Sequence, residues 1–108
     1  MENLSRSEEI ILLSIWNLQG DAYGVRILEK LKETTGTAWT IGAVYAPLHR
    51  LEEKGYIESR PGEPLPVRGG RSRVFYRVTA RGKKALAQAK ALHDALWANA
   101  PDLGWEEA

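Results

Sequence analysis

The sequence contains no cysteine, which excludes disulfide bonds, cysteine-ligated zinc or iron–sulfur sites and thiol nucleophiles. It also lacks any run that approaches the roughly 20 apolar residues of a membrane-spanning helix. The N-terminus shows no basic segment followed by a long apolar stretch, which would mark a secretory signal. From these absences we expect a cytoplasmic protein that contains no metal or cofactor and does not associate with a membrane.

The chain has 108 residues, which is the size of one compact domain. Its hydrophobic fraction of 44% and charged fraction of 27% are ordinary for a folded globular protein. A chain this short buries only a modest share of its surface, so an exposed apolar helix face would gain much from a second subunit.

The net charge is only +1, but the charges are distributed unevenly. Residues 50–84 contain ten Lys or Arg and four Glu, whereas the rest of the chain contains five basic and ten acidic residues. Residues 66–84 contain seven basic residues and no acidic one. Such a segment can neutralise phosphates while the acidic remainder keeps the protein soluble, although it can also be a solvated face.

Three helices are predicted in the first half of the chain. Ser5 and Glu8 have the spacing of a capping box and predict a helix over about residues 6–18. Apolar residues at helical spacing predict further helices over about 23–35 and 40–54, each followed by a glycine. Pro47 lies inside the third of these, so we expect that helix either to begin late, near Ala43, or to bend.

A hairpin and a fourth helix are predicted in the second half. Residues 56–60 and 73–79 read as strands, and the Pro- and Gly-rich segment between them reads as a long basic tip. Thr79 can cap a helix over about 80–99. The fold expected is mainly α with a small β-hairpin: a winged helix-turn-helix domain (residues 1–79), a C-terminal dimerisation helix (80–100) and an acidic tail (101–108).

This order of elements suits double-stranded DNA, because the major groove, about 12 Å wide, admits one helix and leaves the neighbouring phosphates within reach of a projecting hairpin. On the third helix, Val44, Leu48 and Leu51 should face the core. The residues predicted to contact DNA are therefore Thr40, Gly42, Ala43, Tyr45, Ala46, His49 and Arg50 on that helix and Arg68, Gly69, Gly70, Arg71 and Arg73 on the hairpin. Tyr45 could instead be a partly buried core residue.

The sequence resembles the PadR family of transcriptional regulators over about residues 5–97. The resemblance is carried by the order and spacing of several short motifs: Ile11-Leu12-Leu13 through Leu18, Ala22-Tyr23-Gly24-Val25-Arg26-Ile27, Val44-Tyr45, Leu48-His49-Arg50-Leu51-Glu52-Glu53-Lys54-Gly55-Tyr56-Ile57, Gly62-Glu63-Pro64, Arg68-Gly69-Gly70-Arg71, Phe75-Tyr76-Arg77-Val78-Thr79 and Gly82. Pro47 departs from the family pattern, in which a proline at this point, where present, directly follows the tyrosine.

The resemblance implies a homodimer whose C-terminal helices pack against the other subunit, an operator with an inverted repeat, and repression that a small molecule relieves. The residues predicted at the dimer interface are Ile11, Ile15, Leu86, Ala89, Leu92, Leu96 and Trp97. The resemblance also implies a cavity between subunits for a flat aromatic or apolar effector, with Trp97 and Trp16 as its candidates. Simple packing at the interface is the alternative interpretation of Trp97, and the sequence favours it over a ligand cavity.

Two other classes of function compete with DNA binding. A winged helix can serve as a protein interaction module, but such a module has no evident need for the basic segment. An enzyme is the least supported class, since no grouping of nucleophile, base and oxyanion donors and no phosphate-binding glycine loop is present. His49 and His93 are too isolated in the sequence to predict a metal site.

Overall fold

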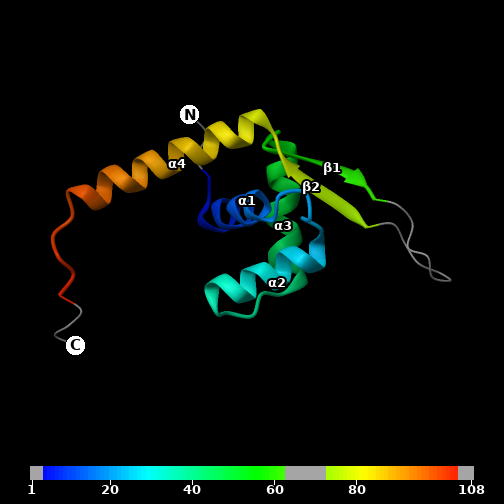
Figure 1. Cartoon of the computed structure of the whole chain (residues 1–108), viewed down its shortest axis with the longest axis horizontal. Coiled ribbons are helices and arrows are strands. Elements are labelled where there is room, and N and C mark those ends of the chain that lie inside the picture. The colour runs from blue at the N-terminus through cyan, green and yellow to red at the C-terminus, as the bar shows by residue number, and fades with distance from the viewer. Residues whose placement is uncertain (1–3, 63–72, 105–108) are drawn as a thin grey trace.

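The computed structural model describes residues 4–62 and 73–104 (Figure 1). Within them lie four helices and one antiparallel hairpin, which confirms the predicted fold class. In chain order the elements are α1 (Arg6–Leu18), α2 (Gly24–Thr35), α3 (Ile41–Glu53), β1 (Ile57–Pro61), β2 (Val74–Val78) and α4 (Ala80–Ala98). None of the helices in the described ranges is long and apolar enough to cross a membrane.

Local signals in the sequence fix the ends of the helices. The backbone N–H of Glu8 donates to Ser5 Oγ at 3.2 Å and the N–H of Ser5 donates to Glu8 Oε1 at 2.8 Å, which confirms the capping box. Thr79 Oγ1 accepts from the N–H of Gly82 at 3.1 Å and so caps α4 as predicted. Gly36 ends α2 with a positive φ of 70°.

Pro47 does not delay the start of α3. The helix begins at Ile41, where Thr40 Oγ1 accepts from the N–H of Ala43 at 3.1 Å, so the expected late start near Ala43 is wrong. Pro47 lies in the helix interior and is buried. A proline there removes one helical hydrogen bond, and burial of its ring in the core offsets part of that cost.

The core lies where α1 crosses α2 and α3 and meets the hairpin (Figure 1). Its members are buried apolar residues of these elements and of the segments that join them: Ile11, Leu12, Ile15, Ala22, Ile27, Leu31, Val44, Leu48, Leu51, Tyr56, Ile57 and Val78. The helix α4 begins over this core and then extends away from it. Its outer half therefore has no cover from the described part of the chain.

The hairpin is tied to the beginning of α2 as well as to α3. Its two strands pair from Ile57 opposite Val78 to Pro61 opposite Val74. The N–H of Tyr76 donates to the carbonyl of Ala22 at 2.8 Å, and Tyr23 forms an isolated bridge with Phe75. The segment before α2 thus acts as a short third strand, which holds β2 at a fixed position beside α2 and α3.

Candidate nucleic-acid interface

One side of α3 faces away from the core. Val44, Leu48 and Leu51 are buried, as predicted. The residues predicted for DNA contact on this helix are all exposed: Thr40, Gly42, Ala43, Tyr45, Ala46, His49 and Arg50. Tyr45 is 45% exposed, so it is not part of the core. This side of the helix is therefore accessible, and its contact with DNA stays a prediction.

Arg50 has a partner within its own chain. Its Nε donates to Glu8 Oε2 at 2.8 Å, and Lys54 Nζ donates to Glu8 Oε1 at the same distance. Glu8 is only 2% exposed. Burial raises the pKa of Glu8, but hydrogen bonds from Lys54, the Ser5 backbone and Arg50 outweigh it and lower the pKa from 4.5 to about 2. The sequence did not reveal this network, because its partners are more than 40 residues apart.

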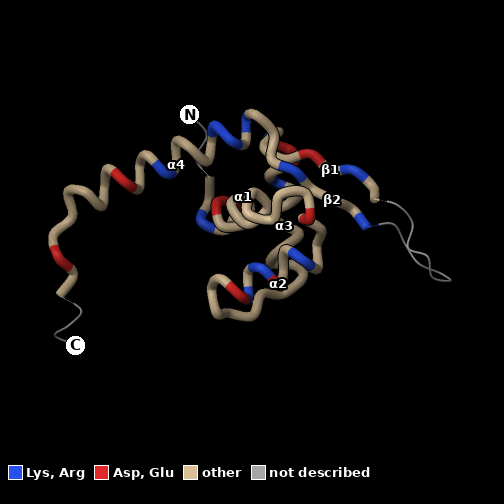
Figure 2. The backbone as a smooth tube through the Cα atoms, in the orientation of Figure 1, with Lys and Arg blue, Asp and Glu red and all other residues tan. Residues whose placement is uncertain are grey.

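Figure 2 shows basic residues on both strands of the hairpin. The arginine side chains there lie in two kinds of environment. Arg77 pairs with Glu58 on the neighbouring strand. Arg60 and Arg73 instead lie over aromatic rings: the guanidinium of Arg60 is 5.5 Å from the centroid of Phe75, and that of Arg73 is 4.5 Å from the centroid of Tyr23. The other predicted hairpin contacts, Arg68, Gly69, Gly70 and Arg71, lie outside the described residues.

A cavity of about 340 Å³ opens where α2, α3 and β2 meet. It is lined by Tyr23, Gly24, Val25, Tyr45, Arg73, Val74 and Tyr76. A Cβ atom at Gly24 would collide with the Tyr45 hydroxyl, so only glycine lets that ring lie over the start of α2. The sequence predictions included Tyr45 and Arg73 but did not bring them together, since their proximity depends on how the hairpin packs.

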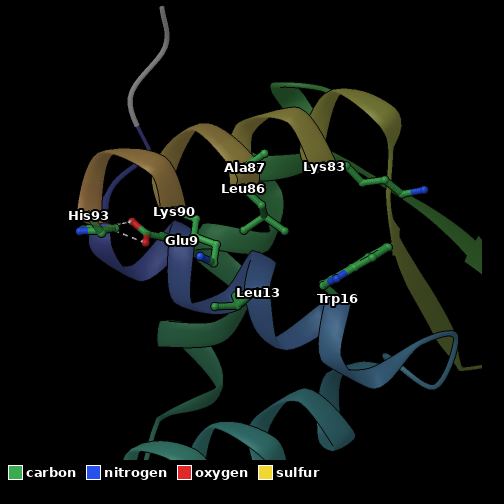
Figure 3. A pocket seen from close by; sticks show the side chains of 8 residues that line it. All are labelled: Glu9, Leu13, Trp16, Lys83, Leu86, Ala87, Lys90 and His93. Carbon is green, nitrogen blue, oxygen red and sulfur yellow. Dashed lines mark hydrogen bonds and ion pairs between the residues drawn. The ribbon is translucent and has the colours of Figure 1, made fainter. Parts of the chain in front are cut away.

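A second, larger cleft of about 540 Å³ lies between α1 and α4 (Figure 3). Its lining residues are Glu9, Leu13, Trp16, Lys83, Leu86, Ala87, Lys90 and His93. Lys83 Nζ is 5.2 Å from the centroid of the Trp16 ring, and His93 Nε2 is 3.0 Å from Glu9 Oε1. Trp16 thus lines a cleft within the chain and Trp97 does not, and the predicted effector cavity between subunits stays a prediction.

The residues predicted at the dimer interface fall into two groups. Leu92, Leu96 and Trp97 are 56%, 60% and 62% exposed, and Leu86 and Ala89 are partly buried. Ile11 and Ile15 are 0% and 2% exposed because they point into the core of their own chain, so their side chains offer no surface to a partner. The large apolar residues that α1 leaves exposed are Leu13 and Trp16, neither of which was predicted at the dimer interface.

The described residues contain no group of three or more His, Cys, Asp or Glu that could hold a metal ion. His49 Nε2 lies 3.5 Å from Glu53 Oε1 one turn later in α3, and both side chains are exposed.

A three-helix head, a hairpin tied to the second helix and a long final helix together define a winged helix-turn-helix protein. The chain matches the PadR-like transcriptional regulator family over residues 12–88, and it belongs to that family. No curated protein matches it.

Several solved structures are similar to this chain. A transcriptional regulator from Clostridium thermocellum is 28% identical, with a TM-score of 0.68 over 83% of this chain and 82% of that one. A PadR-like transcription factor from Bacteroides fragilis is 26% identical, with a TM-score of 0.66 over 82% and 81%. A PadR family transcription regulator from Clostridium difficile is 26% identical, with a TM-score of 0.65 over 82% and 88%.

Proposed function

We propose that this PadR-like regulator is a repressor that binds an inverted-repeat operator as a homodimer. In this proposal α3 enters the major groove and the hairpin lies against the flanking phosphates. The observation that carries it is the exposed side of α3, which the chain leaves uncovered beside a hairpin rich in arginine. Together with membership of a transcriptional regulator family, this surface favours DNA over a protein partner.

The chemistry of the exposed side suits a groove. Gly42, Ala43 and Ala46 add little bulk, so the helix backbone can approach the base edges closely. Tyr45 and His49 can donate to phosphates or bases. Arg50, in contrast, is already held by Glu8 through its Nε, so any phosphate contact would use its other nitrogens.

The outer half of α4 supports the homodimer. Leu92, Leu96 and Trp97 are apolar and largely exposed, and a small domain gains stability when such a face is covered by a second copy. A symmetric dimer presents two α3 helices to successive turns of the same groove, about 34 Å apart, which matches an inverted repeat.

The cleft between α1 and α4 is the candidate effector site. Leu13, Trp16, Leu86 and Ala87 give it apolar walls, and a planar aromatic molecule would stack well on Trp16 (Figure 3). Trp97 of a second copy could close the cleft in the dimer. Because α4 would carry the dimer contacts, a ligand wedged against it would alter the spacing of the two α3 helices and thereby release DNA.

The function is tested by selecting bound duplexes from a random pool and measuring their affinity. We expect an inverted repeat to be enriched. The variant Ala46→Glu, which places a negative charge on the exposed side of α3, should abolish detectable binding, whereas Ala91→Glu, at an alanine of α4 that is also exposed, should retain it. Failure to bind any duplex at low salt would refute the proposal and favour a protein interaction module.

The effector part has its own test. Titration with planar aromatic compounds should quench the tryptophan fluorescence of the native chain saturably. In Trp16→Phe this saturable quenching should be absent. Trp39→Phe is the control, because Trp39 lies in the segment between α2 and α3, where its Nε1 donates to Thr35 Oγ1, and it does not line the cleft. Quenching that never saturates would remove the effector from the mechanism.

A further inference from the structure

The cavity between α2, α3 and β2 has the features of a binding site for a single anion. It combines one arginine, Arg73, with three tyrosines, among them Tyr45 and Tyr76, and its lining includes two exposed valines, Val25 and Val74. We propose that this cavity binds one phosphodiester of the DNA backbone, with Arg73 as its cation and the hydroxyls of Tyr45 and Tyr76 as its donors. This inference rests on the proposed DNA binding. It names the residues that would set the position of the protein on the duplex.

Arg73 differs from most of its neighbours in how its charge is balanced. Arg77 pairs with Glu58, Arg26 with Asp21, Glu29 and Glu33, and Arg50 with Glu8. Among residues 4–62 and 73–104, no carboxylate pairs with Arg73. Its guanidinium lies on the Tyr23 ring at 4.5 Å from the centroid, a contact that orients the group without neutralising it. Its N–H groups thus remain able to bind an anion with a planar fork.

The two hydroxyls are suited to donate. Within the described ranges, neither the Tyr45 nor the Tyr76 hydroxyl has a hydrogen-bond partner. Burial raises the pKa of Tyr76, with further contributions from Tyr45 and Glu52, so its hydroxyl keeps its proton near neutral pH. Glu52 is the one carboxylate that acts on this group, and it is engaged by the Ser59 hydroxyl at 2.6 Å.

The cavity is held in shape before any ligand arrives. The bond from Tyr76 to Ala22 and the bridge between Tyr23 and Phe75 fix β2 against the start of α2, and the Tyr23 and Phe75 rings meet edge to face at 5.5 Å. Gly24 lets Tyr45 lie over the same point. A preformed site loses little conformational entropy on binding, and the two exposed valines offer apolar contact to the sugars on either side of a phosphate.

The test is the salt dependence of binding to a fluorescent mixed-sequence duplex of about three helical turns, because a phosphate contact needs no particular sequence. Arg73→Gln should weaken binding about tenfold at low salt and reduce the slope of log K against log salt by about 1. Arg77→Gln is the matched control, since it removes the same charge from the same hairpin at a residue already paired with Glu58. The slope of log K against log salt for Arg77→Gln should equal that of the native chain.

The hydroxyls are tested by Tyr45→Phe and Tyr76→Phe, which keep the rings and their packing. Each should cost roughly twofold to tenfold in affinity, the usual range for one lost hydrogen bond, and unchanged far-ultraviolet circular dichroism would show that the fold is intact. An unchanged salt slope in Arg73→Gln, or an equal loss of affinity and slope in Arg77→Gln, would overturn the proposed phosphate site while leaving DNA binding in place. Absence of binding by the native chain would instead refute the proposed function itself.

Discussion

The head, which α1, α2 and α3 form, differs from the outer half of α4 in how far its apolar stripe is buried. Ile27 and Leu31 in α2 are completely buried, whereas Leu92, Leu96 and Trp97 in α4 are more than half exposed. Both sets recur at helical spacing, so the difference does not lie in the pattern. The difference lies in the neighbouring elements. The helices of the head pack against one another, whereas the outer half of α4 extends beyond them (Figure 1).

The comparison predicts opposite outcomes for one substitution at two places. Leu31→Ala removes a fully buried side chain and should lower the free energy of unfolding by about 2–5 kcal/mol. Leu96→Ala removes one that a single chain leaves exposed, so any loss should appear only when the protein is dimeric and should depend on protein concentration. Urea unfolding at several concentrations measures both. A concentration-independent loss in Leu96→Ala would mean that α4 packs on its own domain.

The head also contains an ionic network around the buried carboxylate of Glu8, and Glu8→Gln tests how much this network stabilises the fold. The folded pKa of Glu8, about 2, is below its ordinary 4.5, so the carboxylate stabilises the fold above pH 4.5 and loses that effect as the pH falls towards 2. At pH 7 the variant should be less stable by about 3 kcal/mol.

The signature of this network is its dependence on pH. Chemical unfolding should show the difference between native chain and Glu8→Gln shrinking steadily below pH 4.5. Glu29→Gln removes an exposed carboxylate that contacts Arg26 and is the control, with a change below about 1 kcal/mol. A Glu8→Gln deficit that persists undiminished at the lowest pH would mean that shape, not charge, makes Glu8 important.

The junction between the head and α4 should contribute less to stability than the Glu8 network. Thr79 Oγ1 accepts from Gly82 N–H at the start of α4 and donates to the Gly55 carbonyl at 2.7 Å, which joins the helix to the end of α3. Thr79→Ala should cost about 1 kcal/mol, and Thr79→Ser, which keeps both bonds, should cost much less. Thermal unfolding ranks the three proteins. Equal losses in both variants would assign the effect to the methyl group.

Whether the sequence predicted an interaction depends on how far apart in the chain its partners lie. The Ser5 capping box, the Gly36 end of α2 and the Thr79 cap are set by residues a few positions apart, and all were predicted. The contact of Glu8 with Arg50 and Lys54 depends on how α1 crosses α3, which no local pattern encodes.

The faces of α1 illustrate the same limit. Its spacing predicted an apolar side correctly but could not tell which apolar residues the chain itself would cover. Ile11 and Ile15 were therefore assigned to a partner although they lie in the core, while Leu13 on the outer side was overlooked and Trp16 was considered only for an effector. The cavity at Tyr45 and Arg73 was missed for a related reason, since it forms only when β2 docks beside α2.

The smallest expected effect concerns the hydrogen bond between His93 and Glu9, which joins α4 directly to α1. His93 Nε2 lies 3.0 Å from Glu9 Oε1, but the imidazole is half exposed, and exposed pairs of this kind contribute only about 0.2–1 kcal/mol. Apolar packing of Ala85 and Leu86 against the head should hold α4 instead. A double-mutant cycle with His93→Ala and Glu9→Gln should give a coupling energy below about 1 kcal/mol, while Leu86→Ala alone should cost more. A larger coupling would make this pair, and not the packing, the element that sets the direction of α4.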